Sequence, residues 1–135
     1  PDLVIISLGT NESFDKQSGE QYFANLSQMI QGIKDKNPQA CVLVMTSPPS
    51  VLHRKYKNTF IEKYAEFIEE NAHVKNYAVW DLLQVFGGNK SIQRNAAKGY
   101  MARDKVHYSK AGYEKQGDLF FEAFLQSYEL FKSTK

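Results

Sequence analysis

The chain has 135 residues, of which 42% are hydrophobic and 24% charged, a size and composition typical of one globular domain. Seventeen basic and fifteen acidic residues leave a formal net charge of +2, which is too balanced to indicate a nucleic acid or an anionic membrane as partner. No apolar run reaches the roughly 18 residues that a membrane helix needs.

The single cysteine, Cys41, cannot form an internal disulfide. It heads an apolar run over residues 41–45, so we expect it to be a small buried hydrophobic residue. The redox compartment therefore stays open. No cluster of histidine, cysteine and carboxylate side chains indicates a metal, and we expect no cofactor.

In chain order, the first predicted element is a strand over residues 3–8, a continuous apolar run that is typical of a parallel strand covered on both faces. A polar loop is expected over residues 9–19 and an amphipathic helix over about residues 20–36. A second strand follows at residues 41–45. The proline-rich stretch 46–50 then predicts a rigid turn.

The second half of the chain continues this alternation. We predict a helix over about residues 57–71, a short strand at 77–80, a helical turn at 82–86 and a long loop with a short helix inside it over 87–103. Ser109 is a suitable N-cap for a last helix that ends near residue 131. The buried stripe expected on this helix is Tyr113, Phe120, Phe124, Tyr128 and Phe131.

Alternating strands and helices indicate the α/β class, with a parallel sheet and helices on both faces. Three strands are few, because sheets commonly hold about four to six. The run at residues 3–8 has the composition of an interior strand, and the chain begins at Pro1 without an initiator methionine. We therefore expect that an N-terminal portion, including one or more strands, is missing.

A carboxylate precedes a histidine by three positions in Asp104-Lys105-Val106-His107. A short turn would let Asp104 accept a hydrogen bond from the near ring nitrogen of His107, which leaves the far nitrogen free to take a proton from a hydroxyl. Asn11 follows the first predicted strand, at the strand end where α/β sheets build their sites. Taken singly, the Asp-His spacing can arise by chance and an asparagine there can serve turn chemistry.

Other polar residues carry less information. Glu12 is either a pocket residue or a solvated loop carboxylate, and we favour the latter. His53 and His73 are interpreted as surface residues. Ser47 and Ser50 lie near a strand end, but the Gly-x-Ser-x-Gly pattern of a nucleophile elbow is absent around them. For Tyr100 and Met101 two interpretations stay open: they line a substrate pocket, or they cover the core beneath the long loop.

Gly9-Thr10-Asn11 resembles the third sequence block of the SGNH (GDSL-type) hydrolases, and Asp104-Lys105-Val106-His107 with the stretch 108–113 resembles the fifth. The resemblance implies a three-layer α/β/α flavodoxin-like fold, of which residues 1–135 would be the C-terminal two-thirds of a single domain. Residues 86–91 are loosely similar to bacterial members that act on acetylated envelope or polysaccharide carbohydrate.

The resemblance also implies a serine esterase or acylhydrolase. Asn11 would donate to the oxyanion, His107 would act as general base and then general acid, and Asp104 would hold His107. The family's nucleophilic serine lies in a Gly-Asp-Ser block that these residues lack, so we expect the fragment alone to be inactive. The implied substrate is a small acyl ester, including acetyl on carbohydrate, and the implied location is secreted or cell-envelope.

Two other classes of function stay open. The chain could be a non-catalytic binding or structural module on the same scaffold. It could also be a flavodoxin-like regulatory domain, which predicts an acidic pocket for which Asp81 is the obvious candidate. A Gly-Asp-Ser block encoded upstream of Pro1 would favour the enzyme over both.

Overall fold

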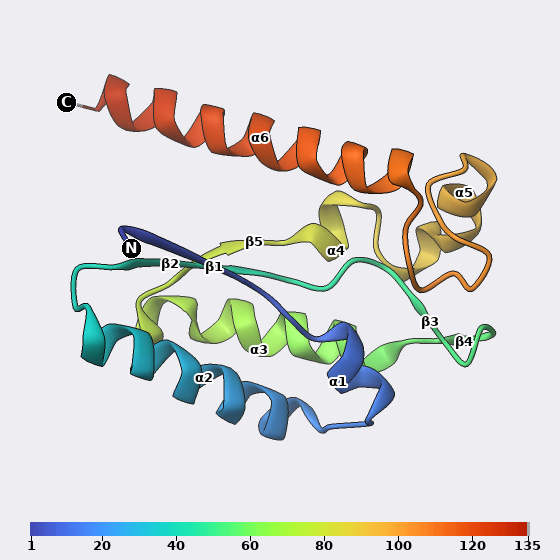
Figure 1. Ribbon diagram of the computed structural model, residues 1–135, viewed down its shortest axis with the longest axis horizontal. Coiled ribbons are helices and arrows are strands. Elements are labelled where there is room, and N and C mark those ends of the chain that lie inside the picture. The colour runs from blue at the N-terminus through green and yellow to red at the C-terminus, as the bar shows by residue number, and fades with distance from the viewer. Residues whose placement is uncertain (135) are drawn as a thin grey trace.

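The computed structural model describes residues 1–134 and has three layers (Figure 1). The middle layer is a parallel sheet in the order β1-β2-β5, made of β1 (Leu3–Ser7), β2 (Cys41–Met45) and β5 (Ala78–Trp80). The helices that cover its two faces are α2 (Gly19–Lys36) and α3 (Thr59–Lys75) on one side and α6 (Lys110–Ser133) on the other. The predicted α/β/α class is confirmed.

The larger core lies between the sheet and the layer formed by α2 and α3. Successive strand residues point to opposite faces, so Ile6 and Val44 are buried in this core whereas Ile5 faces the α6 side and is exposed. Tyr22 from α2 and Tyr64 from α3 stack with ring centroids 4.1 Å apart. This stack joins α2 to α3, and both rings belong to the core that packs against the sheet.

The last helix begins where the sequence predicts. The Ser109 hydroxyl accepts a hydrogen bond from the backbone N–H of Gly112 at 3.1 Å. Any side chain at Gly112 would collide with the carbonyl of Tyr100, so this close packing requires glycine. Trp80 from the sheet contacts Phe120 of α6, with ring centroids 4.9 Å apart.

Two predictions about burial are wrong. Of the expected stripe on α6 only Phe120 is partly buried, while these four are exposed: Tyr113, Phe124, Tyr128 and Phe131. The reason is that the sheet beneath α6 has only three strands and cannot cover the whole helix. Cys41 is also exposed, because it lines an apolar cavity of about 240 Å³ that stays open between the sheet and α6.

Short elements at the strand ends were not all predicted. The loop expected over residues 9–19 contains α1 (Thr10–Phe14), and the turn after β2 leads into a hairpin of β3 (Val51–Leu52) and β4 (Tyr56–Lys57). The helical turn predicted at 82–86 is confirmed as α4 (Leu82–Val85). The long loop predicted over 87–103 holds two short helices, η1 (Asn89–Ser91) and α5 (Ile92–Ala97), where one was expected. No helix within residues 1–134 is long and apolar enough to cross a membrane.

Candidate active site

The carboxyl ends of the strands, α1, the β3–β4 hairpin and the loop before α6 all gather at one end of the molecule, opposite the chain termini (Figure 1). A cavity of about 330 Å³ opens there between three segments of the chain. It is lined by Thr10, Asn11, Phe14, His53, Arg54, Asp104, Val106 and His107. The predicted site residues from the two ends of the sequence therefore line one cavity.

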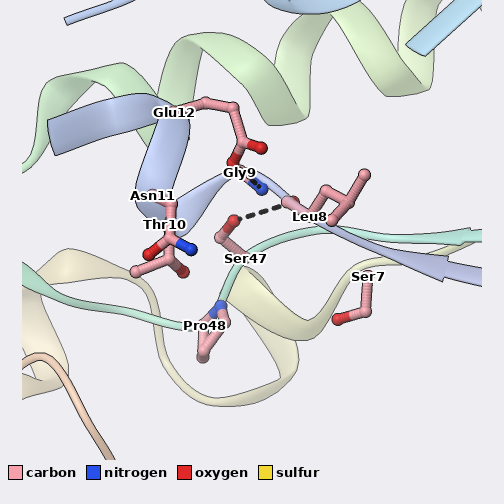
Figure 2. Close-up of a pocket in the computed structure, with 8 residues that line it drawn as sticks. All are labelled: Ser7, Leu8, Gly9, Thr10, Asn11, Glu12, Ser47 and Pro48. Atoms are coloured by element: carbon pink, nitrogen blue, oxygen red, sulfur yellow. Dashed lines mark hydrogen bonds between the residues drawn. The ribbon is translucent and has the colours of Figure 1, made fainter. Parts of the chain in front are cut away.

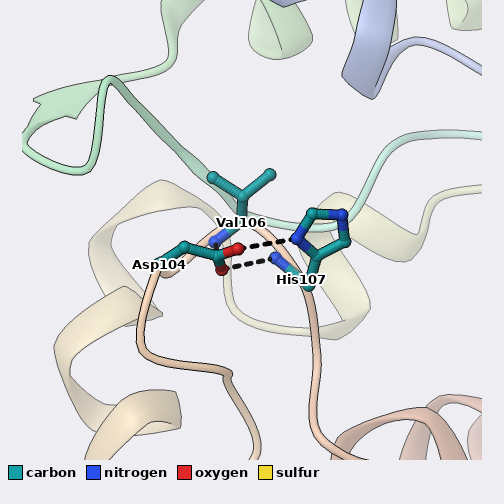
Figure 3. A network of polar contacts seen from close by, with 3 residues as sticks. All are labelled: Asp104, Val106 and His107. Atoms are coloured by element: carbon teal, nitrogen blue, oxygen red, sulfur yellow. Dashed lines mark hydrogen bonds and ion pairs between the residues drawn. The ribbon is translucent and has the colours of Figure 1, made fainter.

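Asp104 and His107 form the hydrogen-bonded pair that their spacing predicts (Figure 3). The Nδ1 atom of His107 lies 2.7 Å from Oδ2 of Asp104, and Oδ1 accepts the backbone N–H groups of Val106 and His107 at 2.9 and 3.0 Å. Lys105 adopts a positive φ of 54°, which turns the chain tightly enough for these contacts. Both carboxylate oxygens are thereby occupied.

The electrostatics of the pair keep the carboxylate ionised. The hydrogen bond from His107, and after it the bond from the Val106 amide, lower the pKa of Asp104 from 3.8 to about 2. The His107 side chain is 72% exposed, and its Nε2 atom makes no hydrogen bond to any residue in 1–134. The ring is thus fixed on one side and available to a reactant on the other.

The loop that carries this pair is anchored on both sides. The Ala102 N–H donates to the His107 carbonyl at 2.9 Å, and the Val51 N–H donates to the Lys105 carbonyl at 3.1 Å. The Tyr108 hydroxyl, whose pKa is raised by burial, donates to the Pro49 carbonyl at 2.7 Å. The loop is therefore held directly against the segment that leads into the β3–β4 hairpin.

Of the two interpretations of Tyr100 and Met101, the structure favours the core. Met101 is 8% exposed and belongs to the cluster beneath α6, and Tyr100 packs against the same cluster. Neither residue lines the cavity that holds His107. Their role is to support the loop from beneath.

Asn11 lies in α1, directly after β1 (Figure 2). Its side chain is exposed and makes no hydrogen bond to another residue of the described chain, so its amide N–H groups are free to meet a ligand. The Gly9 N–H donates to Oε2 of Glu12 at 2.8 Å, and Glu12 is half-buried, which corrects its interpretation as a solvated loop carboxylate. This bond starts α1 and thereby sets the direction of Asn11.

A buried polar network holds α1 from the opposite side. Asn58, which is fully buried, donates through Nδ2 to the hydroxyls of Ser13 at 2.9 Å and Ser50 at 3.1 Å. Ser13 in turn donates to the Thr10 carbonyl at 2.6 Å. The Asn89 amide donates to the Asn58 carbonyl at 2.8 Å. Asn58 therefore ties α1 to the turn after β2 and to the loop beyond α4.

The two serines near the strand end are structural. Ser50 is fully buried in the Asn58 network, and Ser47 is 6% exposed and donates to the Leu8 carbonyl at 3.1 Å (Figure 2). Within residues 1–134, no serine or cysteine lines the cavity that holds His107. Thr10 carries the only hydroxyl among the described side chains that line it, so a serine nucleophile for this cavity is not among them.

Sequence reasoning missed His53 and Arg54 as cavity residues. Both are exposed, as the surface interpretation of His53 expected, yet both line the cavity. They are the central residues of the hairpin turn and have φ values of 48° and 62°. A positive φ costs about 1–2 kcal/mol for each residue other than glycine. Hairpin turns of this kind are therefore recognised in a sequence by pairs such as Asn-Gly, and a His-Arg pair gives no such signal.

The layers of the fold and the cluster of polar groups at the strand ends define an α/β/α protein with a candidate site of the acid–base type. The chain belongs to the GDSL-like lipase/acylhydrolase family, whose pattern it matches over residues 1–115. This confirms the family that the sequence resembles. No curated protein matches the chain.

Two solved structures show the same fold. A structure described as a peptidoglycan O-acetylesterase in action superposes with a TM-score of 0.83 at 23% identity, over 93% of this chain and 37% of that chain. A lipase/acylhydrolase from Enterococcus faecalis gives a TM-score of 0.67 at 24% identity, over 91% of this chain and 60% of that chain. The chain thus spans between about a third and three-fifths of the length of these neighbours.

Proposed function

We propose that this chain supplies the oxyanion donor and the acid–base pair of a serine ester hydrolase. The observation that carries the proposal is the shared cavity, in which the free amide of Asn11 and the Asp104–His107 pair meet although they come from opposite ends of the sequence. Membership of the GDSL-like lipase/acylhydrolase family supports ester hydrolysis as the reaction.

The chemistry follows from the free groups. His107 Nε2 takes the proton of a serine hydroxyl as the oxygen attacks the ester carbonyl, and the Asn11 amide donates to the oxyanion that forms. Asp104 holds the ring in place and stabilises the imidazolium. The imidazolium then protonates the departing alcohol. Water, activated by the same ring, cleaves the acyl-enzyme and releases the acid.

The serine itself would come from a segment outside residues 1–135, in agreement with the interpretation of this chain as the C-terminal two-thirds of one domain. Within the described chain β1 pairs only with β2, and on its α6 side Leu3 and Ile5 are 40% and 45% exposed. A parallel strand added at this free edge would end beside Asn11, at the rim where α/β sheets place their sites. A helix after it would cover Leu3, Ile5 and the exposed aromatic residues of α6.

The proposed substrate is a small acyl ester, with acetyl groups on carbohydrate as the favoured class. The cavity is open, and six of its eight lining residues have polar or charged side chains, which suits a hydrophilic alcohol. Phe14 and Val106 add an apolar part to the lining, which suits a small acyl group. One neighbour of the same fold is described as a peptidoglycan O-acetylesterase, which agrees with this class. The chemistry needs no metal or cofactor, and we propose no nucleic-acid partner.

Fluorophosphonate labelling tests the proposal, because this probe reacts with a serine that is activated as a nucleophile. We expect the full-length protein encoded with this chain to be labelled on a serine upstream of Pro1, and the 135-residue chain alone to remain unlabelled. His107→Ala should abolish the labelling. His73→Ala, which changes an exposed histidine on α3, is the matched control and should retain it.

Two results would contradict the proposal. Labelling of the full-length protein that survives His107→Ala would remove the ring from the reaction. A full-length protein that has no Gly-Asp-Ser block and takes no label would favour a non-catalytic binding module on this scaffold instead.

A further inference from the structure

We propose that the turn of the β3–β4 hairpin is a carboxylate-binding subsite, in which Arg54 selects acyl esters that are carried on acidic saccharides. This inference rests on the proposed ester hydrolase function and adds the class of the alcohol that the site prefers. The group that Arg54 would bind is a carboxylate on the sugar, which either a uronic acid or a lactyl ether supplies. Its basis is the position, the free charge and the backbone of the turn.

Arg54 is the only lysine or arginine that lines the cavity with Asn11 and His107, as far as residues 1–134 are concerned. Its guanidinium makes no ion pair or hydrogen bond within the described chain, and the side chain is exposed. Asp104, the carboxylate in the same cavity, already accepts three hydrogen bonds. Among the described residues Arg54 therefore has no direct partner, and its guanidinium donors are available to a group that enters the cavity.

Neighbouring basic side chains are engaged elsewhere. Lys57 pairs with Glu62 at 2.8 Å, and the Lys55 ammonium lies 5.6 Å from the ring centroid of Tyr56. Neither lysine lines the cavity. The turn thus carries several positive charges, but only one of them faces the candidate site.

The backbone of the turn supports a role for the side chains. The Lys55 N–H donates to the Leu52 carbonyl at 3.1 Å, and both central residues, His53 and Arg54, have positive φ. Asparagine and glycine are the residues that such turns favour. Backbone strain is often retained at functional sites, so two large residues with positive φ at a cavity indicate that their side chains have a role there.

The turn is also fixed relative to the loop that carries Asp104 and His107. Val51 and Leu52 are 7% and 9% exposed, so β3 is anchored in the protein. The hydrogen bond from the Val51 N–H to the Lys105 carbonyl joins the hairpin directly to the loop between Asp104 and His107. The backbone position of the turn relative to the loop that carries Asp104 and His107 is therefore set by the fold.

The chemistry points to a carboxylate on the alcohol part of the ester. A guanidinium binds carboxylates through two parallel N–H donors, which a neutral sugar hydroxyl cannot match. An acetyl ester carries no charge, so the cation has no partner in the acyl group itself. An acidic group on the sugar would satisfy Arg54 while the ester lies between Asn11 and His107.

The test uses the full-length protein and two matched substrates, an O-acetylated glucuronic acid glycoside and the same glycoside of glucose. The measured quantity is the ratio of kcat/KM for the acidic substrate to that for the neutral one. Arg54→Gln should lower this ratio by about 10-fold or more, because it removes hydrogen bonds between charged groups. Lys55→Gln removes the same charge from the adjacent position outside the cavity and should leave the ratio within about 2-fold.

A second variant guards against loss of folding. Arg54→Gly suits the positive φ of this position, so its Tm should equal or exceed that of the unchanged protein while the preference for the acidic substrate disappears. An unchanged ratio in Arg54→Gln, or an equal fall in Lys55→Gln, would overturn the subsite.

The subsite and the proposed function can fail separately. If neither substrate is hydrolysed, fluorophosphonate labelling decides the ester hydrolase proposal, and binding of free glucuronate measured by calorimetry decides the subsite. Binding that is lost in Arg54→Gln and kept in Lys55→Gln supports it. Binding that is absent or equal in both variants refutes it.

Discussion

The orientation of α1, and with it that of Asn11, depends on one buried side chain. Asn58→Ala removes the two hydrogen bonds from Nδ2 to the hydroxyls of Ser13 and Ser50. A net hydrogen bond contributes about 1 kcal/mol, so we expect the free energy of unfolding to fall by about 2 kcal/mol. The Oδ1 atom accepts no hydrogen bond within the described residues, so its removal adds no further loss. The carbonyl that accepts from Asn89 is retained.

Urea denaturation of the chain, followed by circular dichroism, measures this change. Asn71→Ala is the matched control, because Asn71 lies on α3, close to Asn58 in sequence, and donates a single hydrogen bond to the Phe67 carbonyl at 2.9 Å at a partly exposed position. Its replacement by the better helix former should change stability by less than about 0.5 kcal/mol. The contrast isolates the buried network from the general effect of removing an amide.

A loss below about 0.5 kcal/mol in Asn58→Ala would refute the reasoning, because a buried donor of two bonds would then contribute no more than a surface amide. A large loss with an unchanged m-value would agree with a local defect in an otherwise intact fold. In the full-length protein the same variant should lower kcat more than it raises KM, since it misplaces Asn11 without removing it.

The remaining predictions concern the Asp104–His107 pair and Asn11. Asp104 should titrate at about pH 2 by carbon NMR, and in His107→Ala its pKa should move up towards 3.8 because the hydrogen bond from the ring is its main cause. The pKa of Asp104 is lower in the folded chain than in the unfolded chain. The stability that Asp104 contributes is therefore present above pH 3.8 and is lost as the pH falls through about 2. A loss of stability that already begins near neutral pH would contradict this. Asn11→Ala in the full-length protein should lower kcat by about 100-fold with little change in KM, as expected for an oxyanion donor. An unchanged kcat would exclude Asn11 from that role.

Much of the fold could be predicted from the sequence because its signals are local. The apolar run at residues 3–8, the helical period that ends at Lys36 and the N-cap at Ser109 each specify an element within a few residues of chain. The Asp104–His107 contact was predictable for the same reason, since three positions and one turn suffice to form it. The burial of α6 was not, because it depends on how much sheet lies beneath the helix.

The residues that line the cavity could not all be predicted from local sequence patterns, because the topology of the fold brings them together. Parallel strands end at the same edge of the sheet, so Asn11 after β1 and the loop after α5 are brought to one rim although the sequence separates them widely. His53 and Arg54 reach the same rim through the hairpin, which a backbone hydrogen bond from Val51 joins to the loop that carries Asp104 and His107, and no side-chain pattern encodes that contact. A strained His-Arg turn is unfavourable for the hairpin considered alone. The same turn places His53 and Arg54 in the cavity beside the ionised Asp104. A role for these side chains in the cavity therefore explains why the strained turn is present.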